Sequence, residues 1–280
     1  MKIFGRVWLA IGLISVGLGI CLLILATSVG LRIDGRDTYS FDESYANVKS
    51  LDIQFDYGEV NIVEGDTFMV SSDSLLEDGE FESVVLDGVW TIKESINQKI
   101  NIFGWKIPML TFSGTDFLQE ITITVPKGFI AENVHLELGA GVLKADVIRS
   151  NTGYFEVDAG EMSINQLEVS QESSYKIGTG YISLEDVEVN NITIDCGIGY
   201  VDIAGIVNGD NKVSSDIGAV NLDLVGNSDD YAYRIDSGIG NAIINGKGYH
   251  HKNFGRKSNK IYRGSFDIEC NIGQITLDIY

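Results

Sequence analysis

The chain has 280 residues, enough for one large domain or two small ones, and carries a formal net charge of −20. Such an acidic chain argues against a nucleic-acid-binding protein, which would present a basic face. Only two prolines argue against a proline-rich stalk, and 32 glycines without the collagen period indicate many turns.

The first predicted element is a transmembrane helix over residues 7–31. This stretch carries no charge, and as a helix it would extend roughly 37 Å, enough to cross a hydrocarbon core of about 30 Å. A cleaved signal peptide is the alternative, but its apolar region usually has about 7–15 residues. We therefore expect a cytoplasmic tail over residues 1–6, a linker over 32–46, and a single-pass protein of the cell membrane whose N-terminus is cytoplasmic and whose C-terminal domain is extracytoplasmic.

Beyond this segment the sequence alternates between apolar and polar residues at period two, between clusters of Gly, Asn, Asp and Ser. This alternation is typical of strands with one buried face, and no stretch shows sustained helical periodicity. We expect an all-β ectodomain over residues 47–280. Its parts are an irregular N-terminal part (47–133), regular coils (134–246), a basic insertion (247–263) and a last coil (264–280).

A phrase built around one glycine, here called the anchor glycine, recurs along the ectodomain. The anchors are Gly141, Gly160, Gly180, Gly199, Gly218, Gly240 and Gly273, with Gly58 as an outlying earlier copy. The residues two and four positions after each anchor are apolar, and the residue five positions before it is apolar or aromatic. Strict alternation places these residues on one face of a strand and their polar neighbours on the other.

Each repeat is therefore predicted to be two short strands joined by a glycine corner. A single repeat cannot bury its apolar face, but stacked repeats share one core. The glycines would permit positive φ at the corner and keep side chains out of the way of the next coil. The predicted fold is an all-β parallel β-solenoid with about 19–20 residues per coil, stacked in sequence order and preceded by one N-terminal transmembrane helix.

The cysteines test this stacking. Cys21 lies in the predicted span, whereas Cys196 and Cys270 each stand three residues before an anchor and should point inward as small buried side chains. In sequence order their coils are three steps apart, or roughly 14 Å at about 4.8 Å per step. A disulfide needs Cα atoms within about 7 Å, so we expect two free, shielded thiols.

No catalytic or cofactor-binding motif is present. The paired glycines look like part of a phosphate-binding loop, but the third glycine is missing and a strand pattern follows instead of a helix, so no nucleotide is expected. A polysaccharide lyase would need clustered acids and a basic residue, whereas the basic residues are scattered. We expect no enzymatic activity, no cofactor and no metal. The corner aspartates could form a calcium ladder, but the turn role of aspartate is favoured; they are Asp56, Asp158, Asp195, Asp216 and Asp236.

Charge is segregated along the chain. Residues 37–246 hold 36 acidic and 10 basic residues, whereas residues 247–263 hold six basic residues and no acid. One interpretation is a solvated insertion loop. The other is a patch for an anionic partner, such as wall polymer, lipid headgroups or an acidic neighbour of the same chain. The six residues of this candidate patch are Lys247, Lys252, Arg256, Lys257, Lys260 and Arg263.

Three features together resemble the bacterial putative-adhesin family. They are the strand SLDIQFDYGEVNIVEGD (50–66), the element ITITVPKGF (121–129) and the run of glycine-cornered coils that follows. The resemblance covers roughly residues 47–280. It implies a β-solenoid ectodomain, often behind one membrane span in Gram-positive bacteria, and a role in surface adhesion, and it supplies no catalytic residues. The long segment 67–120 and the insertion before the last coil depart from the family pattern.

We therefore expect a non-catalytic binding or scaffold module at the cell surface or envelope, anchored in the cytoplasmic membrane. The expected partners are the membrane and either cell-wall polymer or another envelope protein, with no nucleic acid. Two alternatives stay open. One is an envelope-stress signalling co-component that acts through a membrane partner, since only six residues precede the predicted span. The other is a solenoid polysaccharide-active enzyme.

Overall fold

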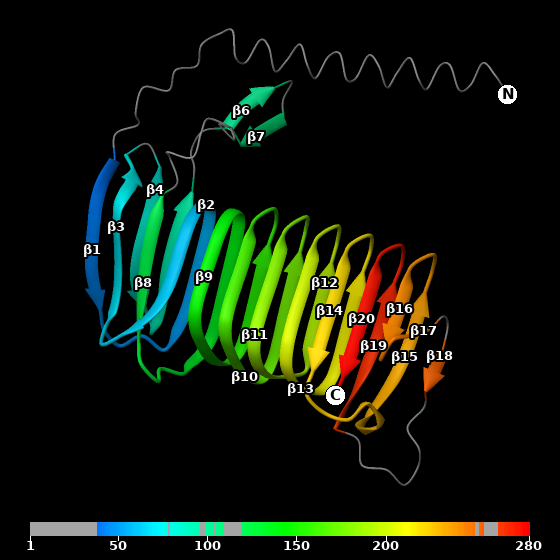
Figure 1. Ribbon diagram of the computed structural model, residues 1–280. Coiled ribbons are helices and arrows are strands. Elements are labelled where there is room, and N and C mark those ends of the chain that lie inside the picture. The colour runs from blue at the N-terminus through cyan, green and yellow to red at the C-terminus, as the bar shows by residue number, and fades with distance from the viewer. Residues whose placement is uncertain are drawn as a thin grey trace, which may run out of the picture. The chain divides into compact units, whose positions relative to one another are not determined.

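Strands dominate the fold (Figure 1). The computed structural model describes residues 38–77, 79–95, 99–102, 105–108, 119–249, 252–254 and 263–280. Strands of the N-terminal part are β1 (Thr38–Tyr45), β2 (Ser50–Gly65), β3 (Phe68–Leu76), β4 (Glu80–Leu86), β5 (Val89–Ser95), β6 (Lys99–Ile102), β7 (Trp105–Pro108) and β8 (Glu120–Pro126). The hairpin β6–β7 forms its own two-stranded sheet, and all other strands belong to one 18-stranded sheet.

The repeat region supplies the remaining strands. They are β9 (Ala131–Val157), β10 (Glu161–Ile177), β11 (Tyr181–Asn190), β12 (Ile192–Cys196), β13 (Tyr200–Ser215), β14 (Ala219–Leu224), β15 (Tyr231–Ser237), β16 (Asn241–Ile244), β17 (Lys247–Tyr249), β18 (Lys252–Phe254), β19 (Gly264–Cys270) and β20 (Gln274–Ile279). One 3-10 turn, Ser228–Asp230, precedes β15.

The predicted fold class, a parallel β-solenoid preceded by a transmembrane helix, is corrected by the structure. The described fold is all-β, and within the described ranges no helix is long and apolar enough to cross a membrane. The expected span, residues 7–31, lies outside those ranges. Part of the expected linker 32–46 is a strand, since β1 pairs antiparallel with β3.

Successive repeats pair in parallel and in register. The strand β2 pairs with β9, and β9 pairs with β10, so the outlying copy around Gly58 lies directly beside the coil of Gly141. The next coils follow in the same way, from β10 to β11 and β12, and from these two to β13. Because each strand has a partner at nearly the same position one repeat away, each polar or apolar position of the phrase forms a row along the stack.

The last coil departs from sequence order. The strands β19 and β20 pair with β13 and β14 on one side and with β15 and β16 on the other. In Figure 1 the red strands accordingly lie between yellow and orange ones. Side-chain hydrogen bonds agree with this position of the last coil, because Ser265 Oγ donates to Asp210 Oδ1 at 2.7 Å and Arg234 Nη1 donates to Asp267 Oδ2 at 2.9 Å. The coil order at this end is therefore Gly199, Gly218, Gly273, Gly240.

The basic insertion contributes to the end of this stack. The strand β17 pairs antiparallel with β16, and β18 pairs antiparallel with β15. Unpaired edges of a sheet invite pairing with other chains, and short covering strands remove that hazard. At the other end, β1, β3 and β4 make the antiparallel pairings β1–β3, β3–β8 and β4–β5.

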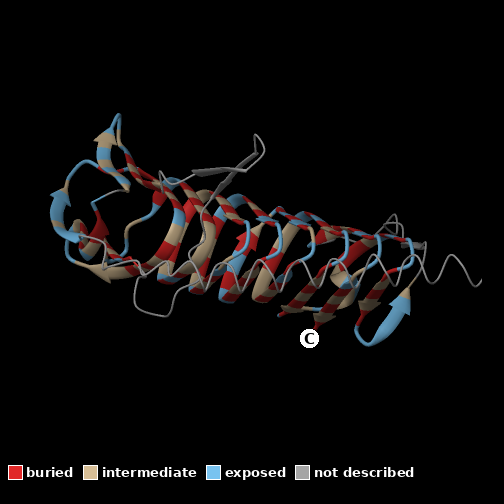
Figure 2. Ribbon diagram, turned by 90° about the horizontal axis from the view of Figure 1, so that it is seen from above, coloured by how far each residue is buried: buried red, intermediate tan, exposed pale blue. Residues whose placement is uncertain are grey.

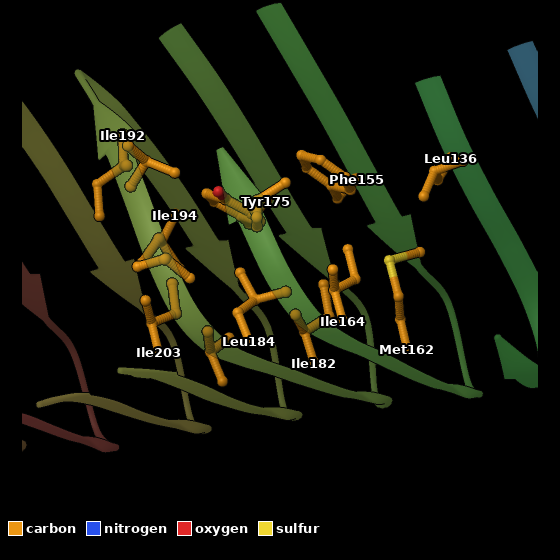
Figure 3. Packing of buried hydrophobic residues seen from close by; sticks show 14 of the residues in the cluster. Leu136, Phe155, Met162, Ile164, Tyr175, Ile182, Leu184, Ile192, Ile194 and Ile203 are labelled. Carbon is orange, nitrogen blue, oxygen red and sulfur yellow. The ribbon is translucent and has the colours of Figure 1, made fainter. Parts of the chain in front are cut away.

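The predicted inward residues form the core, and this prediction is confirmed. All sixteen residues two and four positions after an anchor are at most 6% exposed, and the eight residues five positions before an anchor are at most 3% exposed. Figure 2 shows buried residues alternating with intermediate and exposed ones along the strands, and Figure 3 shows inward side chains of successive coils, such as Ile182, Leu184 and Ile203, packed together. Each such side chain stabilises the fold by roughly 1.5–3 kcal/mol relative to exposure.

The anchor glycines are required by close approach of backbones. A Cβ on Gly199 would lie 2.3 Å from the carbonyl oxygen of Gly180, and a Cβ on Gly273 would lie 1.9 Å from that of Gly218. Both distances are far inside van der Waals contact. Positive φ, the other expected reason, applies among the anchors only to Gly58 (144°) and Gly141 (125°).

Both described cysteines are buried and free, as predicted. The predicted three-step separation is wrong, however. Cys196 is in register with Ser215, and Ser215 with Cys270, so the two cysteines lie two steps apart. This is roughly 10 Å at about 4.8 Å per step, still beyond the reach of a disulfide. The inserted last coil is the reason for the shorter separation.

Candidate binding surfaces

The outward residues of the first strand of each coil form a surface that we call the polar face. Its first row stands six positions before the anchors and runs, in stacking order, through Asp52, His135, Tyr154, Ser174, Thr193, Lys212, Asp267 and Arg234. Its second row stands four positions before the anchors and runs through Gln54, Glu137, Glu156, Lys176, Asp195, Ser214, Glu269 and Asp236. Side chains of one row stand about 4.8 Å apart.

Hydrogen bonds within and between coils connect the side chains in the N-terminal half of the polar face. His135 Nδ1 lies 2.9 Å from Asp52 Oδ1, and its ring packs edge-on against Tyr154 with centroids 5.0 Å apart. The Tyr154 hydroxyl and the Lys176 ammonium both donate to the carboxylate of Glu156. The hydrogen bond to Glu156, with burial, raises the pKa of Tyr154 to about 12. Burial opposes ionisation of Glu156, but the two donors outweigh it and lower the pKa of this carboxyl.

An acidic cavity of about 500 Å³ lies where the coils meet β4 and β5. Lys93 lines it together with six carboxylates, which are Asp56, Glu80, Glu82, Glu94, Glu137 and Asp158. Glu94 is only 3% exposed and accepts hydrogen bonds from Gln119 Nε2 at 2.8 Å and from the Tyr57 amide at 3.2 Å. Burial raises the pKa of Glu94 to about 6 despite these donors. The repeat pattern did not predict a role for Glu94, because this residue lies in the irregular segment outside the repeat.

Two of the five corner aspartates bond across coils. Asp216 Oδ1 accepts from Asn271 Nδ2 at 2.9 Å, and Asp195 Oδ1 accepts from Ser214 Oγ at 3.4 Å. Each donor lies on the neighbouring coil, so these carboxylates tie coils together rather than closing a local turn. Within the part of the chain that the structure describes, no group of three His, Cys, Asp or Glu side chains could hold a metal ion.

The candidate basic patch is only partly described. Lys247 is exposed at the start of β17, and Lys252 starts β18, whereas Arg256, Lys257 and Lys260 lie outside the described residues. Arg263 donates to the Asn208 side chain and, at 3.3 Å, to the carbonyl oxygen of Val225.

Arg263 therefore belongs to the coil junction. Its partners lie on the coil of Gly218, whereas Lys247 pairs with the coil of Gly240, and the last coil lies between these two. The anionic-partner site stays a prediction.

Comparisons with known proteins give distant likenesses only. No protein-family model matches the chain, and no curated protein matches its sequence. Among solved structures, a "putative adhesin" from Bacteroides fragilis is 11% identical with a TM-score of 0.43, covering 86% of this chain and 97% of its own. A "putative adhesin" from Parabacteroides distasonis is 16% identical with a TM-score of 0.43, covering 88% and 98%. A "putative cell adhesion protein" from Clostridium sporogenes is 13% identical with a TM-score of 0.32, covering 87% and 100%. TM-scores below 0.5 carry no argument about the function of this chain.

Proposed function

We propose that the β-domain is a non-catalytic, adhesin-like binding module of the cell envelope whose partner is another envelope protein. The observation that carries the proposal is the polar face, where outward side chains of eight adjoining coils stand in two registered rows. Such a surface offers many evenly spaced polar groups to an extended partner. We infer the location at the cell envelope from the sequence resemblance, and this inference does not depend on a transmembrane helix.

The charge of the polar face favours a protein over an anionic wall polymer. Acidic residues outnumber basic ones, since its rows contain seven carboxylates but only Lys176, Lys212 and Arg234 as permanent cations; the carboxylates are Asp52, Glu137, Glu156, Asp195, Asp236, Asp267 and Glu269. Complementary charge steers association, and like charges juxtaposed at an interface are costly. A polymer rich in phosphate or carboxylate would be repelled, whereas a protein surface with Lys and Arg would be attracted.

Site-specific photocrosslinking in cells that naturally make the protein tests the proposal. A photoreactive amino acid at Thr193, exposed in the first row of the polar face, is compared with one at Glu188, exposed on β11 of the preceding repeat. We expect a discrete adduct with an envelope protein from position 193 and little from position 188. Equal adducts from both positions, or adducts with polysaccharide alone, would contradict it. Release of sugar fragments from wall material by the purified protein would refute its non-catalytic part.

A further inference from the structure

A row of exposed isoleucines runs along the corner between the two strands of each coil. In stacking order it consists of Ile198, Ile217, Ile272 and Ile239, which are 62, 54, 56 and 87% exposed. Their coils adjoin, because the Ile217 amide donates to the Gly197 carbonyl at 2.9 Å and the Ile272 amide to the Asp216 carbonyl at 2.8 Å. The Ile239 amide likewise donates to the Asn271 carbonyl at 2.8 Å. We call these four residues the isoleucine ladder.

The fold does not require large apolar side chains here. Each of these residues directly precedes an anchor glycine, and the same position in the three preceding coils holds the small residues Ala140, Ala159 and Thr179. The anchor glycine packs its backbone against the neighbouring coil, so the residue before it has no core to enter. Isoleucine in four adjoining coils therefore exposes apolar surface without serving the packing, and contiguous exposed apolar surface commonly marks an interaction site.

A shallow groove accompanies the ladder. It measures about 680 Å³ and is lined by Thr179, Tyr200, Ala219 and Gln274 beside three of the ladder isoleucines. Tyr200 is 39% exposed, and its ring lies 5.5 Å from that of Tyr181. Tyr200 and Ala219 extend the apolar stripe on the side of the second strands.

The borders of the ladder are acidic. In each of these four coils the borders extend from six positions before the anchor to five positions after it. Together they contain eight acidic residues and only two basic ones, Lys212 and Arg234. The acidic residues are Asp195, Asp202, Asp216, Asp223, Asp236, Asp267, Glu269 and Asp278. A second copy docked ladder to ladder would bring two acidic borders together, and an anionic lipid surface would be repelled in the same way. The complementary occupant has an apolar stripe bordered by Lys or Arg.

The spacing of the rungs selects the conformation of this occupant. Rungs about 4.8 Å apart give roughly 14 Å over the four isoleucines. Apolar residues on one face of an α-helix recur about every 5.4 Å, or roughly 16 Å over three turns. Alternate residues of a strand recur about every 6.7 Å, or roughly 20 Å over three steps. A helix stays close to register with the ladder, and a strand does not.

We propose that the isoleucine ladder binds an amphipathic α-helix of a partner protein, lying along the stack with its apolar stripe on the isoleucines and its Lys or Arg residues over the acidic borders. Helix-in-groove docking of this kind uses apolar anchors at helical spacing. The four isoleucines belong to neither row of the polar face, although one acidic border of the ladder does, and substitutions of the isoleucines therefore test this inference apart from crosslinking at Thr193.

The test uses the full-length protein and a fluorescent synthetic 18-residue helix with Leu at helical spacing and Lys along both borders of the stripe. Fluorescence anisotropy measures binding, and the control peptide has Glu in place of every Lys. We expect the Lys peptide to bind, to weaken as salt rises, and to bind at least tenfold more weakly to the double variant Ile217→Ser, Ile272→Ser. Ile130→Ser is the matched control variant, because Ile130 is 62% exposed but lies outside the ladder; it should leave the affinity unchanged within twofold.

A second pair of substitutions tests the charge requirement without touching the ladder. Asp202→Asn with Asp223→Asn removes two border charges and should weaken binding several-fold and reduce its dependence on salt. The inference is overturned if the Lys peptide does not bind, if the Glu peptide binds equally well, or if Ile130→Ser weakens binding as much as the ladder variant. It is also overturned if the ladder substitutions instead abolish self-association in sedimentation or binding to zwitterionic lipid vesicles, since a second copy or a lipid surface would then be the occupant.

Discussion

The core register is tested most sharply by two adjacent residues of β13. Ile203 is fully buried and lies in register between Leu184 and Leu222 of the neighbouring coils, in the layer shown in Figure 3. Ile203→Ala removes three carbon atoms, or about 2.4 kcal/mol at 0.8 kcal/mol each. The two flanking coils hold the site open, so a cavity adds to this loss, and the total should be about 3–4 kcal/mol.

The matched control is Asp202→Ala, one residue away on the outer surface. Asp202 accepts a hydrogen bond from Asn221 Nδ2 at 3.0 Å, and its loss should cost about 1 kcal/mol or less. Urea unfolding followed by circular dichroism, with equal m-values for the two variants, gives both free energies of unfolding. Comparable losses for the two variants, or a loss below about 1 kcal/mol for Ile203→Ala, would refute the proposed inward and outward assignment.

Three further predictions concern the core and the acidic cavity. Burial raises the pKa of the Cys196 thiol to about 11 and also raises that of Cys270, so neither should react with iodoacetamide at pH 8 until the protein unfolds; rapid alkylation of the native protein, measured by mass spectrometry, would contradict this. Gly273→Ala forces a Cβ to 1.9 Å from the Gly218 carbonyl oxygen. It should lower the free energy of unfolding by about 1–3 kcal/mol or more, measured as a lower Tm. An unchanged Tm would show that the coils are not in such close contact. The pKa of Glu94 rises from 4.5 to about 6 on folding, so the folded state gains stability as pH falls through 6 toward 4.5 and is penalised above 6. Urea unfolding measures the free energy of unfolding of Glu94→Gln relative to wild type, and this difference should be about 2 kcal/mol more favourable to the variant at pH 7.5 than at pH 4.5. An equal difference at both pH values would show that the pKa of this carboxyl is not raised.

The alternation of the sequence was sufficient to predict which residues are buried. Val201 and Ile203 point inward and Asp202 outward because a strand has a period of two, whatever its neighbours are. The corner glycines were equally predictable, since residues that recur once per coil meet their counterparts along the stack.

The order of the coils could not be predicted in the same way. Every copy of the phrase offers the same backbone hydrogen bonds and the same apolar row, so the coil of Gly218 can be followed in the stack by that of Gly273 as well as by that of Gly240. In the structure β17 and β18 pair with the outer edges of β16 and β15, which are the edges on which the last coil would stack in sequence order. Anchor spacings of 22 and 33 residues around Gly240, against 19 or 20 elsewhere, were the only sign of a departure.

Surface features were missed for a related reason. In the repeat phrase Ile198 is one residue of a glycine corner, and its exposure follows only from the close packing of the glycines on either side. The signal was nevertheless present, because the residue before the anchor changes from Ala140 and Ala159 to isoleucine in four later copies. Glu94 had no such signal, since its burial depends on Gln119 and on the fold of β5 against β2.

Every surface described above depends on the stacking order, and disulfide trapping measures that order directly. Asp210 is in register with Ser265, and Ser265 with Ala232. The double variant Asp210→Cys, Ser265→Cys places the new thiols on adjacent strands, within the Cα separation of about 4.4–6.8 Å that a disulfide needs. The variant Asp210→Cys, Ala232→Cys places them two strands apart, at roughly 10 Å. After mild oxidation of the folded protein, peptide mapping should find the 210–265 disulfide and no 210–232 disulfide. Formation of the 210–232 disulfide in place of the other would mean that the coils stack in sequence order, and it would contradict the account.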